Sequence, residues 1–304
     1  MYSYLAYGLR ISSSIPLSAL VTSSHENADA CINYGSLPTP PPASQAVVSG
    51  AHFRAAQDGI FLFWSDVGTI LVRNGRDIIV DPGPEMDERE LVAALLGPAM
   101  AALLHQRGKL VLHASTVAFN GEAFAFIGTT GQGKSTLALA LYALGDELVA
   151  DEITSIDVTC SPPQVAPAHP RLNAWPAVFT ALSYDPMPLE KVEAASDKRC
   201  FPATERFAEG RQRLSGIYEL VQGETSTIER LTPHKALKPL CYHSYCLKYC
   251  TRAEAAVHFS QCASLIKAIP VNRLTVSRSD TSITELAELV QTHVRTHRTP
   301  RDNA

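Results

Sequence analysis

The sequence predicts an α/β fold with a β-rich segment in front of it, and three observations indicate this. A glycine-rich loop at 128–133 lies between an apolar run typical of a strand and an apolar run typical of a helix. Short apolar runs separated by turn signals fill the chain before residue 82, which favours strands. Hydrophobic residues make up 46% of the chain and charged residues 18%, so it can bury a sizeable core.

Length, charge and cysteine content limit the classes of protein that fit. The 304 residues are enough for two domains or one large one, and a formal charge of −4 indicates no nucleic-acid-binding surface. The longest apolar run, 91–104, is too short to span a bilayer, and the N-terminus lacks the pattern of a secretory signal. We therefore expect a cytoplasmic protein with no membrane partner. The seven cysteines are expected to be reduced thiols.

Residues 1–85 are expected to form a small β-rich N-terminal domain. The proline-rich stretch at 36–45 can be neither a helix nor a central strand. Residues 59–82 then give three short apolar runs, and Asn74-Gly75 within them is a strong hairpin signal. This pattern predicts a small antiparallel sheet.

Residues 86–290 are expected to form the second domain, and 291–304 a flexible tail. Acidic residues from Asp87 onward fit a helix N-terminus, and Gly97-Pro98 should kink or divide that helix. Two strands joined at Asn120-Gly121 lead into the glycine loop. The other expected elements are a helix at 134–144, a strand pair at 146–158, loops with short helices at 161–186, two strands around Gly223, and helices with one strand, at 271–278, from residue 234 onward.

The glycine loop matches the pattern G-x-x-x-x-G-K-[ST] at 128–135. Its glycines let successive backbone N–H groups point at one spot, at the start of a helix whose dipole favours an anion. We predict that this loop binds the phosphates of a nucleotide, with Lys134 at the β- and γ-phosphates and Ser135 on Mg²⁺. The predicted nucleotide-binding residues are Gly128, Thr129, Thr130, Gly131, Gln132, Gly133, Lys134, Ser135 and Thr136.

Two carboxylates follow the loop by about one helix and one strand. Asp151 and Glu152 end the apolar run of "LVADEI". An acidic residue there, beside a phosphate loop, can hold Mg²⁺ or accept a proton from an attacking hydroxyl. His113 lies on the strand that precedes the loop hairpin. Taken alone, a histidine on an apolar strand is more often a core residue than a catalytic one.

At these residues the chain resembles the HPr kinase/phosphorylase family, and more closely the shorter HPr-kinase-like proteins. Three segments carry the resemblance in order: "LHAST", "GTTGQGKSTLALAL" and "LVADEI". It covers 110–157 well and extends more weakly through "HPRLNAWP", "SDKRCFP", "CYHSYCLKYC" and "FSQCASLIKAIPV". The resemblance implies a P-loop kinase core with a mixed sheet, phosphoryl transfer from ATP to a serine hydroxyl, and an oligomer.

The resemblance also assigns roles to individual residues. Asp151 takes the position of the proton acceptor, and His113 takes a supporting catalytic position near it. Lys134 and Ser135 take the positions of the loop lysine and serine, so that the catalytic set is Asp151, His113 and Lys134. Ser135 and Glu152 would hold Mg²⁺. The expected cofactors are therefore ATP and Mg²⁺.

The sequence also departs from that family in ways that bear on the substrate. Glu152 stands where the family has a second aspartate, and the acidic segment that follows the core in true HPr kinases is missing. The N-terminal region does not look like their regulatory domain. The chain is similar in size to HPr-kinase-like proteins that modify a lasso-peptide precursor. We therefore expect the partner to be a peptide or small protein that carries a serine or threonine.

Two other functions stay open at this point. One is an ATP-binding regulatory module that transfers nothing, and the other is a kinase of a small hydroxylated metabolite. The presence of Asp151 shortly after Lys134 favours an enzyme over a bare binding module.

Two further groups of residues are open to alternative interpretations. Lys198 and Arg199 can add positive charge opposite the phosphates as substrate-binding residues, or be two solvated surface charges. The cysteines of "CYHSYCLKYC" have spacings that match no standard metal-ligand pattern. Cys246 and Cys250, one helical turn apart, equally fit a buried helix face.

Overall fold

The structure is a computed structural model that describes residues 1–25, 27–192, 196–277 and 281–296. Among these residues, a nine-stranded sheet forms the N-terminal part of the protein. Its order is β3-β1-β2-β4-β9-β8-β7-β6-β5, and the pairs β2–β4 and β4–β9 are parallel. The strands are β1 (Tyr2–Ala6), β2 (Leu9–Ser13), β3 (Val21–Thr22), β4 (Ala30–Tyr34), β5 (Val48–Gly50), β6 (Phe53–Ala56), β7 (Gly59–Trp64), β8 (Gly68–Arg73) and β9 (Asp77–Pro82).

The predicted antiparallel sheet at 59–82 is confirmed as β7, β8 and β9. Asn74 and Gly75 form the turn between β8 and β9 with φ values of 57° and 58°, the left-handed region that such a turn requires. The sheet as a whole is larger than predicted and mixed, because β4 joins the two halves through parallel pairs. Those pairs depend on contacts between distant segments, which no local pattern reveals.

A kinked helical segment covers one face of this sheet. It consists of α1 (Glu88–Ala94), the π-helical turn η1 (Leu95–Ala99) and α2 (Met100–Gln106). The Asp87 side chain caps it, accepting hydrogen bonds from the amides of Arg89 and Glu90. The predicted kink is confirmed, since Gly97 has a non-helical backbone with φ −94° and ψ −106°.

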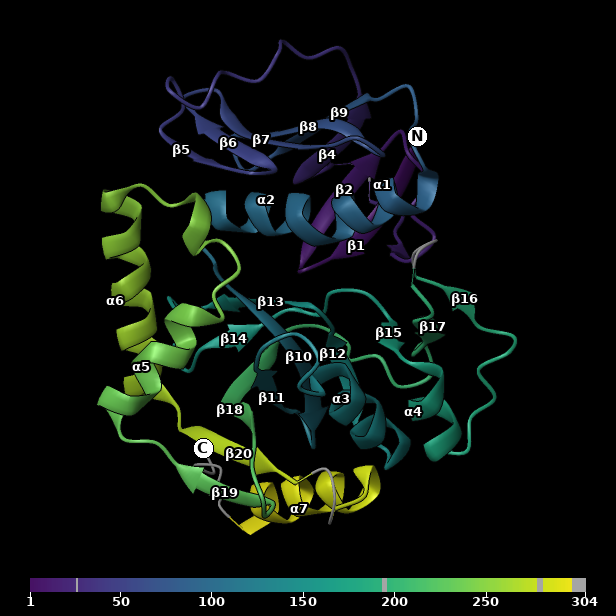
Figure 1. Cartoon of the computed structure of the whole chain (residues 1–304), viewed down its shortest axis with the longest axis vertical. Helices are drawn as coiled ribbons and strands as arrows, with labels where there is room; N and C mark the ends of the chain where they lie inside the picture. The colour runs from purple at the N-terminus through teal and green to yellow at the C-terminus, as the bar shows by residue number, and fades with distance from the viewer. Residues whose placement is uncertain (26, 193–195, 278–280, 297–304) are drawn as a thin grey trace.

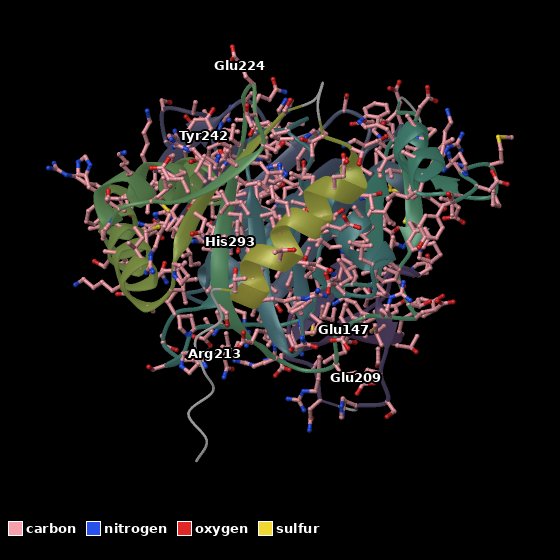
Figure 2. All side chains as sticks on the ribbon, turned by 90° about the horizontal axis from the view of Figure 1, so that it is seen from below. Glu147, Glu209, Arg213, Glu224, Tyr242 and His293 are labelled. Carbon is pink, nitrogen blue, oxygen red and sulfur yellow. The ribbon has the colours of Figure 1, made fainter. Side chains whose placement is uncertain are left out.

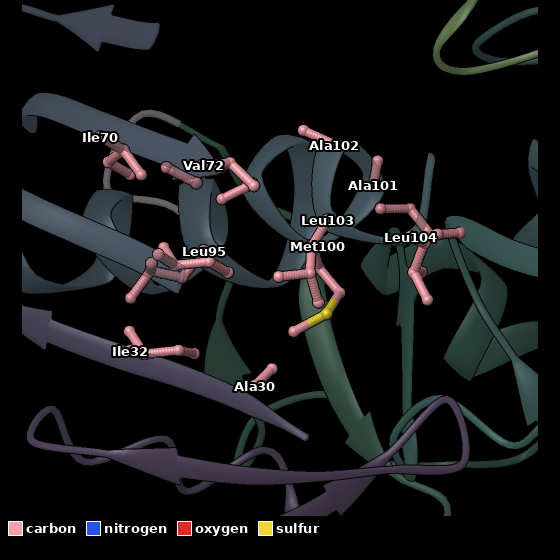
Figure 3. Packing of buried hydrophobic residues seen from close by; sticks show 14 of the residues in the cluster. Ala30, Ile32, Ile70, Val72, Leu95, Met100, Ala101, Ala102, Leu103 and Leu104 are labelled. Carbon is pink, nitrogen blue, oxygen red and sulfur yellow. The ribbon is translucent and has the colours of Figure 1, made fainter. Parts of the chain in front are cut away.

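The same helical segment lies between the N-terminal sheet and the second sheet (Figure 1). Its buried apolar residues, from Leu91 to Leu104, share one core with the facing residues of the first sheet, such as Ile70 and Ile32 (Figure 3). That core also includes Val111 and Ile153 of the second sheet. The predicted domain boundary at 85/86 therefore precedes a helical segment that packs against both sheets.

The second sheet is mixed, as expected. Its order is β11-β10-β13-β14-β18-β20-β19; β12 also pairs with β10, and β11 also pairs with β18. The pairs β11–β18 and β18–β20 are parallel. The strands are β10 (Leu110–Phe119), β11 (Glu122–Ile127), β12 (Glu147–Ala150), β13 (Ile153–Asp157), β14 (Gln164–Val165), β18 (Gln212–Gln222), β19 (Thr227–Arg230) and β20 (Val271–Val276).

The strands expected at 146–158 and around Gly223 exist, and their pairing partners are distant in sequence. The elements expected at 146–158 exist as β12 and β13, but each pairs with β10 rather than with the other. The strands expected around Gly223 exist as β18 and β19, and both pair with β20. The β10–β11 hairpin at Asn120-Gly121 is confirmed.

Apolar layers cover both faces of the second sheet. Along β11, Phe124 and Phe126 face one core while Ala123, Ala125 and Ile127 face the other. The first core includes α3 (Lys134–Ala143) and α7 (Ile283–Thr296), and the second includes α5 (Pro233–Tyr242) and α6 (Arg252–Ala268). The remaining elements are α4 (Pro176–Ala181), the short 3-10 helix η2 (Leu247–Tyr249), and a small sheet of β15 (Arg171–Ala174), β16 (Glu190–Lys191) and β17 (Arg199–Pro202).

The sequence predicted that residues 291–296 belong to a flexible tail. The structure shows instead that they form the last turns of α7. Gln291 and Val294 are buried, and His293 Nδ1 lies 2.9 Å from the Tyr218 hydroxyl. Figure 2 shows α7 with His293 from below. The apolar face of the helix explains why it is ordered against the sheet. Residues 297–304 of the expected tail lie outside the described residues.

Within the described part of the chain, no helix is both long enough and apolar enough to cross a membrane.

The helical layer between the two sheets gives a stability prediction. Leu103 has no exposed surface, so Leu103→Ala should lower the free energy of unfolding by about 2–5 kcal/mol through lost burial and a cavity. Leu144→Ala, at a side chain that is 39% exposed, should change it by less than about 1 kcal/mol. Urea denaturation measures both. Equal effects would contradict the described packing.

Candidate functional site

The glycine loop lies between the end of β11 and the start of α3, the context that the motif requires. Gly131 and Gly133 have φ values of 84° and 97°, which L side chains rarely adopt. A Cβ on Gly128 would lie 2.8 Å from Gln132 Oε1 and 3.2 Å from the Leu220 carbonyl oxygen. Sterics and backbone conformation therefore account for all three glycines.

Lys134 folds back over this loop. Its ammonium donates to the Gly128 carbonyl oxygen at 2.8 Å and to the Thr129 carbonyl oxygen at 3.4 Å. The side chain is buried, and burial lowers the pKa of Lys134 while the Asp151 charge opposes that shift. A positive charge is thus held directly over the loop in a partly desolvated setting.

Helix α3 starts at this loop without a side-chain cap among the described residues. Gly133 is its N-cap and supplies no side-chain hydrogen bond to the first turn. Ser135 and Thr136, in that first turn, are half-buried. The helix dipole and the first-turn amides favour an anion at the loop.

Asp151 is only 2% exposed, and two segments hold its carboxylate. Oδ1 accepts a hydrogen bond of 2.6 Å from the Ser115 hydroxyl on β10, and Oδ2 accepts one of 3.0 Å from the Asn173 amide on β15. Each carboxylate oxygen has a second lone pair, so the group is fixed in orientation while keeping capacity to accept.

Glu152 differs from its neighbour in both exposure and backbone. Its side chain is exposed, whereas Asp151 is buried. Its φ is 70°, an uncommon and strained value for glutamate, and its carbonyl oxygen accepts a hydrogen bond of 3.2 Å from the Ala114 amide. The strained turn sends the two adjacent side chains into different environments.

His113 is a half-buried residue on β10. Its amide donates to the His243 carbonyl oxygen at 2.9 Å, and its ring meets the Tyr245 ring edge-on at 6.1 Å between centroids. Burial, with the Lys134 charge as the next cause, lowers the pKa of His113 to about 4. The imidazole is therefore neutral at pH 7 and can exchange hydrogen bonds without adding charge to the site.

Lys198 and Arg199 have different surroundings in the structure. The Lys198 charge contributes to lowering the pKa values of both His113 and Lys134, so it lies within electrostatic range of the loop. Its ammonium also lies 5.8 Å from the centre of the half-exposed Trp175 ring. Arg199 instead donates to the Leu189 carbonyl oxygen at 3.3 Å.

The structure adds residues that the sequence analysis missed. Ser115 lies two positions after His113 on one face of β10, so strand alternation was the signal that could have found it. Tyr7 comes from the turn between β1 and β2 in the N-terminal sheet, and its hydroxyl has no hydrogen-bond partner among the described residues. Burial raises the pKa of Tyr7, and the charges of Glu152 and Asp151 add to this. No local pattern connects Tyr7 to these carboxylates.

Comparisons with known proteins find likenesses among solved structures. No protein-family model matches the chain, and no curated protein matches it. Among solved structures, the HPr(Ser) kinase/phosphatase from Coxiella burnetii is similar with a TM-score of 0.34 and 12% identity. The match covers 61% of this chain and 97% of that one. This TM-score is too low to define a shared fold or to assign an activity.

A buried histidine beside β15 gives a pH prediction. Burial lowers the pKa of His169 from 6.5 to about 4, and its Nδ1 has no hydrogen-bond partner among the described residues. As the pH falls, His169 therefore binds a proton near pH 6.5 in the unfolded chain but only near pH 4 in the folded chain. The associated stability is complete above pH 6.5 and is lost as the pH falls to 4, by at most about 3 kcal/mol.

Urea denaturation between pH 7 and pH 4 checks this. In His169→Gln, the fall in unfolding free energy with decreasing pH should be shallower by up to about 1.4 kcal/mol per pH unit. His25→Gln, at an exposed position, should keep the wild-type slope. An unchanged slope in His169→Gln would show that His169 does not titrate below its usual range.

Proposed function

We propose that the protein is an ATP-dependent kinase that transfers the γ-phosphate to a serine or threonine hydroxyl of a peptide or small protein. One observation carries the proposal: a buried lysine covers a glycine loop at a helix N-terminus, within electrostatic range of a buried and oriented carboxylate. This combination supplies a phosphate cradle and a proton acceptor in one site.

Binding would follow from the groups that the loop already presents. The amides of 133–136, at the start of α3, and the α3 dipole receive the β- and γ-phosphates. Lys134 would move its ammonium from the Gly128 carbonyl to phosphate oxygens, a short change because the phosphates would lie on the same loop that carries Gly128. Lys198 would add positive charge on the substrate side, and Arg199 would not.

The residues present fit a magnesium ion. Mg²⁺ prefers oxygen ligands and keeps several waters, so one or two protein oxygens suffice. Ser135 is half-buried in the first turn of α3, and Glu152 is exposed beside Asp151, so both can face the phosphates. When bound, the ion would neutralise the charge that develops on the phosphate oxygens.

In the transfer step, the substrate oxygen forms a bond to the γ-phosphorus while the bond to the β,γ-bridging oxygen breaks. Asp151 accepts the hydroxyl proton at an oxygen whose other lone pair is held by Ser115 or Asn173. Neutral His113, on the same strand face as Ser115, would support the geometry without repelling Lys134. Most of the catalysis would come from positioning and electrostatic stabilisation.

The resemblance to lasso-peptide precursor kinases supports a precursor peptide as the acceptor. A second candidate function is an ATP-binding regulatory module without transfer. The observation in its favour is the burial of Asp151, whose two oxygens already accept protein hydrogen bonds. A kinase must let an acceptor hydroxyl reach one of these oxygens, whereas a module need not.

The test is transfer of radiolabelled γ-phosphate with Mg²⁺ to serine- and threonine-containing peptides, including peptides encoded beside the gene. Asp151→Asn should reduce transfer by about 10²–10⁴-fold while leaving ATP affinity nearly unchanged, because it removes the proton acceptor but not the loop. Lys134→Ala should weaken ATP binding itself.

Asp58→Asn, at an exposed turn of the N-terminal sheet, is the matched control and should keep full transfer. ATP binding without transfer to any peptide would favour the regulatory module. Transfer only to a small hydroxylated metabolite would replace the peptide acceptor. Unchanged ATP binding in Lys134→Ala would overturn the proposed site.

A further inference from the structure

A second cluster of chemically reactive side chains lies outside the glycine-loop site, between α5 and α6. Cys241 belongs to the last turn of α5, and His258 and Cys262 belong to α6. Their ligand atoms all lie within 4.8 Å of one another. They are the cysteine and histidine types that bind thiophilic metal ions.

Helix geometry explains how three residues from two segments meet. His258 and Cys262 are four positions apart, so they lie on the same face of α6. That face packs against α5, whose C-terminal end carries Cys241. Cys262 and His258 are buried and Cys241 is half-buried, so the cluster is closed on the protein side and open beside Cys241.

Hydrogen bonds determine which histidine nitrogen is available to a ligand. The Ser244 hydroxyl donates to the Leu240 carbonyl oxygen at 2.8 Å, so it must accept at its other contact, from His258 Nε2 at 2.6 Å. Nε2 therefore carries the proton, and the lone pair of a neutral ring is on Nδ1. Nδ1 lies 3.9 Å from Cys262 Sγ and Nε2 lies 3.8 Å from it, so the hydrogen bond to Ser244 rather than distance selects Nδ1, and its separation suits two ligands of one ion.

The arrangement of Ser244 resembles the outer support of metal sites in general. A metal-bound histidine usually donates its other ring N–H to an oxygen acceptor, which fixes the ring orientation. Ser244 provides that acceptor and is itself held by Leu240 at one turn's spacing.

We propose that Cys241, His258 and Cys262 form a zinc site with three protein ligands and an open fourth position beside Cys241. Two thiolates neutralise the charge of a divalent ion, and sulfur with imidazole nitrogen selects Zn²⁺ over Mg²⁺ or Ca²⁺. Binding would release the two thiol protons and form two Zn–S bonds and one Zn–N bond.

The proposed ligands include only one cysteine of the sequence motif "CYHSYCLKYC". Cys246 donates to the Ala101 carbonyl oxygen at 3.2 Å, and Cys250 lies 3.8 Å from His105, so these two cysteines belong to the contact with α2. They also flank a 3-10 helix rather than one face of an α-helix. Of that sequence motif, only Cys241 belongs to the cluster.

The site would brace the segment that supports β10. The His113 amide donates to the His243 carbonyl oxygen and the Tyr245 amide donates to the Val111 carbonyl oxygen, each at 2.9 Å. This segment immediately follows Cys241, so a metal that joins α5 to α6 would hold it in place. The inference concerns metal and stability, and it stands whether or not the protein transfers phosphate.

The first test uses the full chain expressed with zinc in the medium and purified without chelator. Elemental analysis should find about one zinc per chain. Co²⁺ added to the metal-free protein should give the intense visible bands of tetrahedral coordination and a near-ultraviolet thiolate-to-cobalt band. Absence of both zinc and the cobalt spectrum would overturn the proposal, as would a mass lower by two hydrogens that reveals a Cys241–Cys262 disulfide.

Variants test the ligand assignment. Cys262→Ala and Cys241→Ser should each weaken metal binding by more than about 100-fold, because loss of an outer partner alone typically costs 10–100-fold. Cys241 is half-buried, so Cys241→Ser keeps the test valid if Cys262→Ala does not fold. Cys160→Ser, outside the cluster, should bind like wild type. A chelator should lower the Tm of wild type and of Cys160→Ser but not of Cys241→Ser; equal binding by all variants would overturn the assignment.

Discussion

The pairing of β10 with its neighbours is the constraint on which the rest of the site depends. This strand pairs with β11, which leads into the glycine loop, and with β12 and β13, which flank Asp151 and Glu152. It also carries Ser115, which holds the Asp151 carboxylate. Because backbone hydrogen bonds fix the register of these strands, a one-residue slip would turn Ser115 to the opposite face and release Asp151.

Burial strengthens the electrostatic interactions of the few charged side chains at this site. Lys134 and Asp151 are both nearly inaccessible, and the low effective dielectric around them strengthens their mutual interaction and their attraction for ligand charge. Neutral His113 and the uncharged Tyr7 hydroxyl complete the surroundings without cancelling either charge. A site of this kind favours an anion at the loop and a proton donor at Asp151, which is the pairing that phosphoryl transfer needs.

Local signals predicted much of the fold, and non-local pairings account for the rest. The Asn-Gly turns, the Gly97-Pro98 kink and the strand–loop–helix at 122–143 depend on local patterns of adjacent residues, so the sequence shows them. The partners of β12, β18 and β19 depend on strands that are distant in sequence, as does the approach of Tyr7 to Asp151. The cluster of Cys241, His258 and Cys262 was not predicted from the sequence for the same reason, because two helices must pack before it forms.

A crystal structure with a non-hydrolysable ATP analogue and Mg²⁺ tests the central claim most directly. The account predicts that the β- and γ-phosphates lie on the amides of the glycine loop. It also predicts that the Lys134 ammonium has left the Gly128 carbonyl for a phosphate oxygen, and that Asp151 faces the γ-phosphate while keeping its contact with Ser115. A nucleotide bound elsewhere, or a loop with Lys134 still on Gly128, would contradict it.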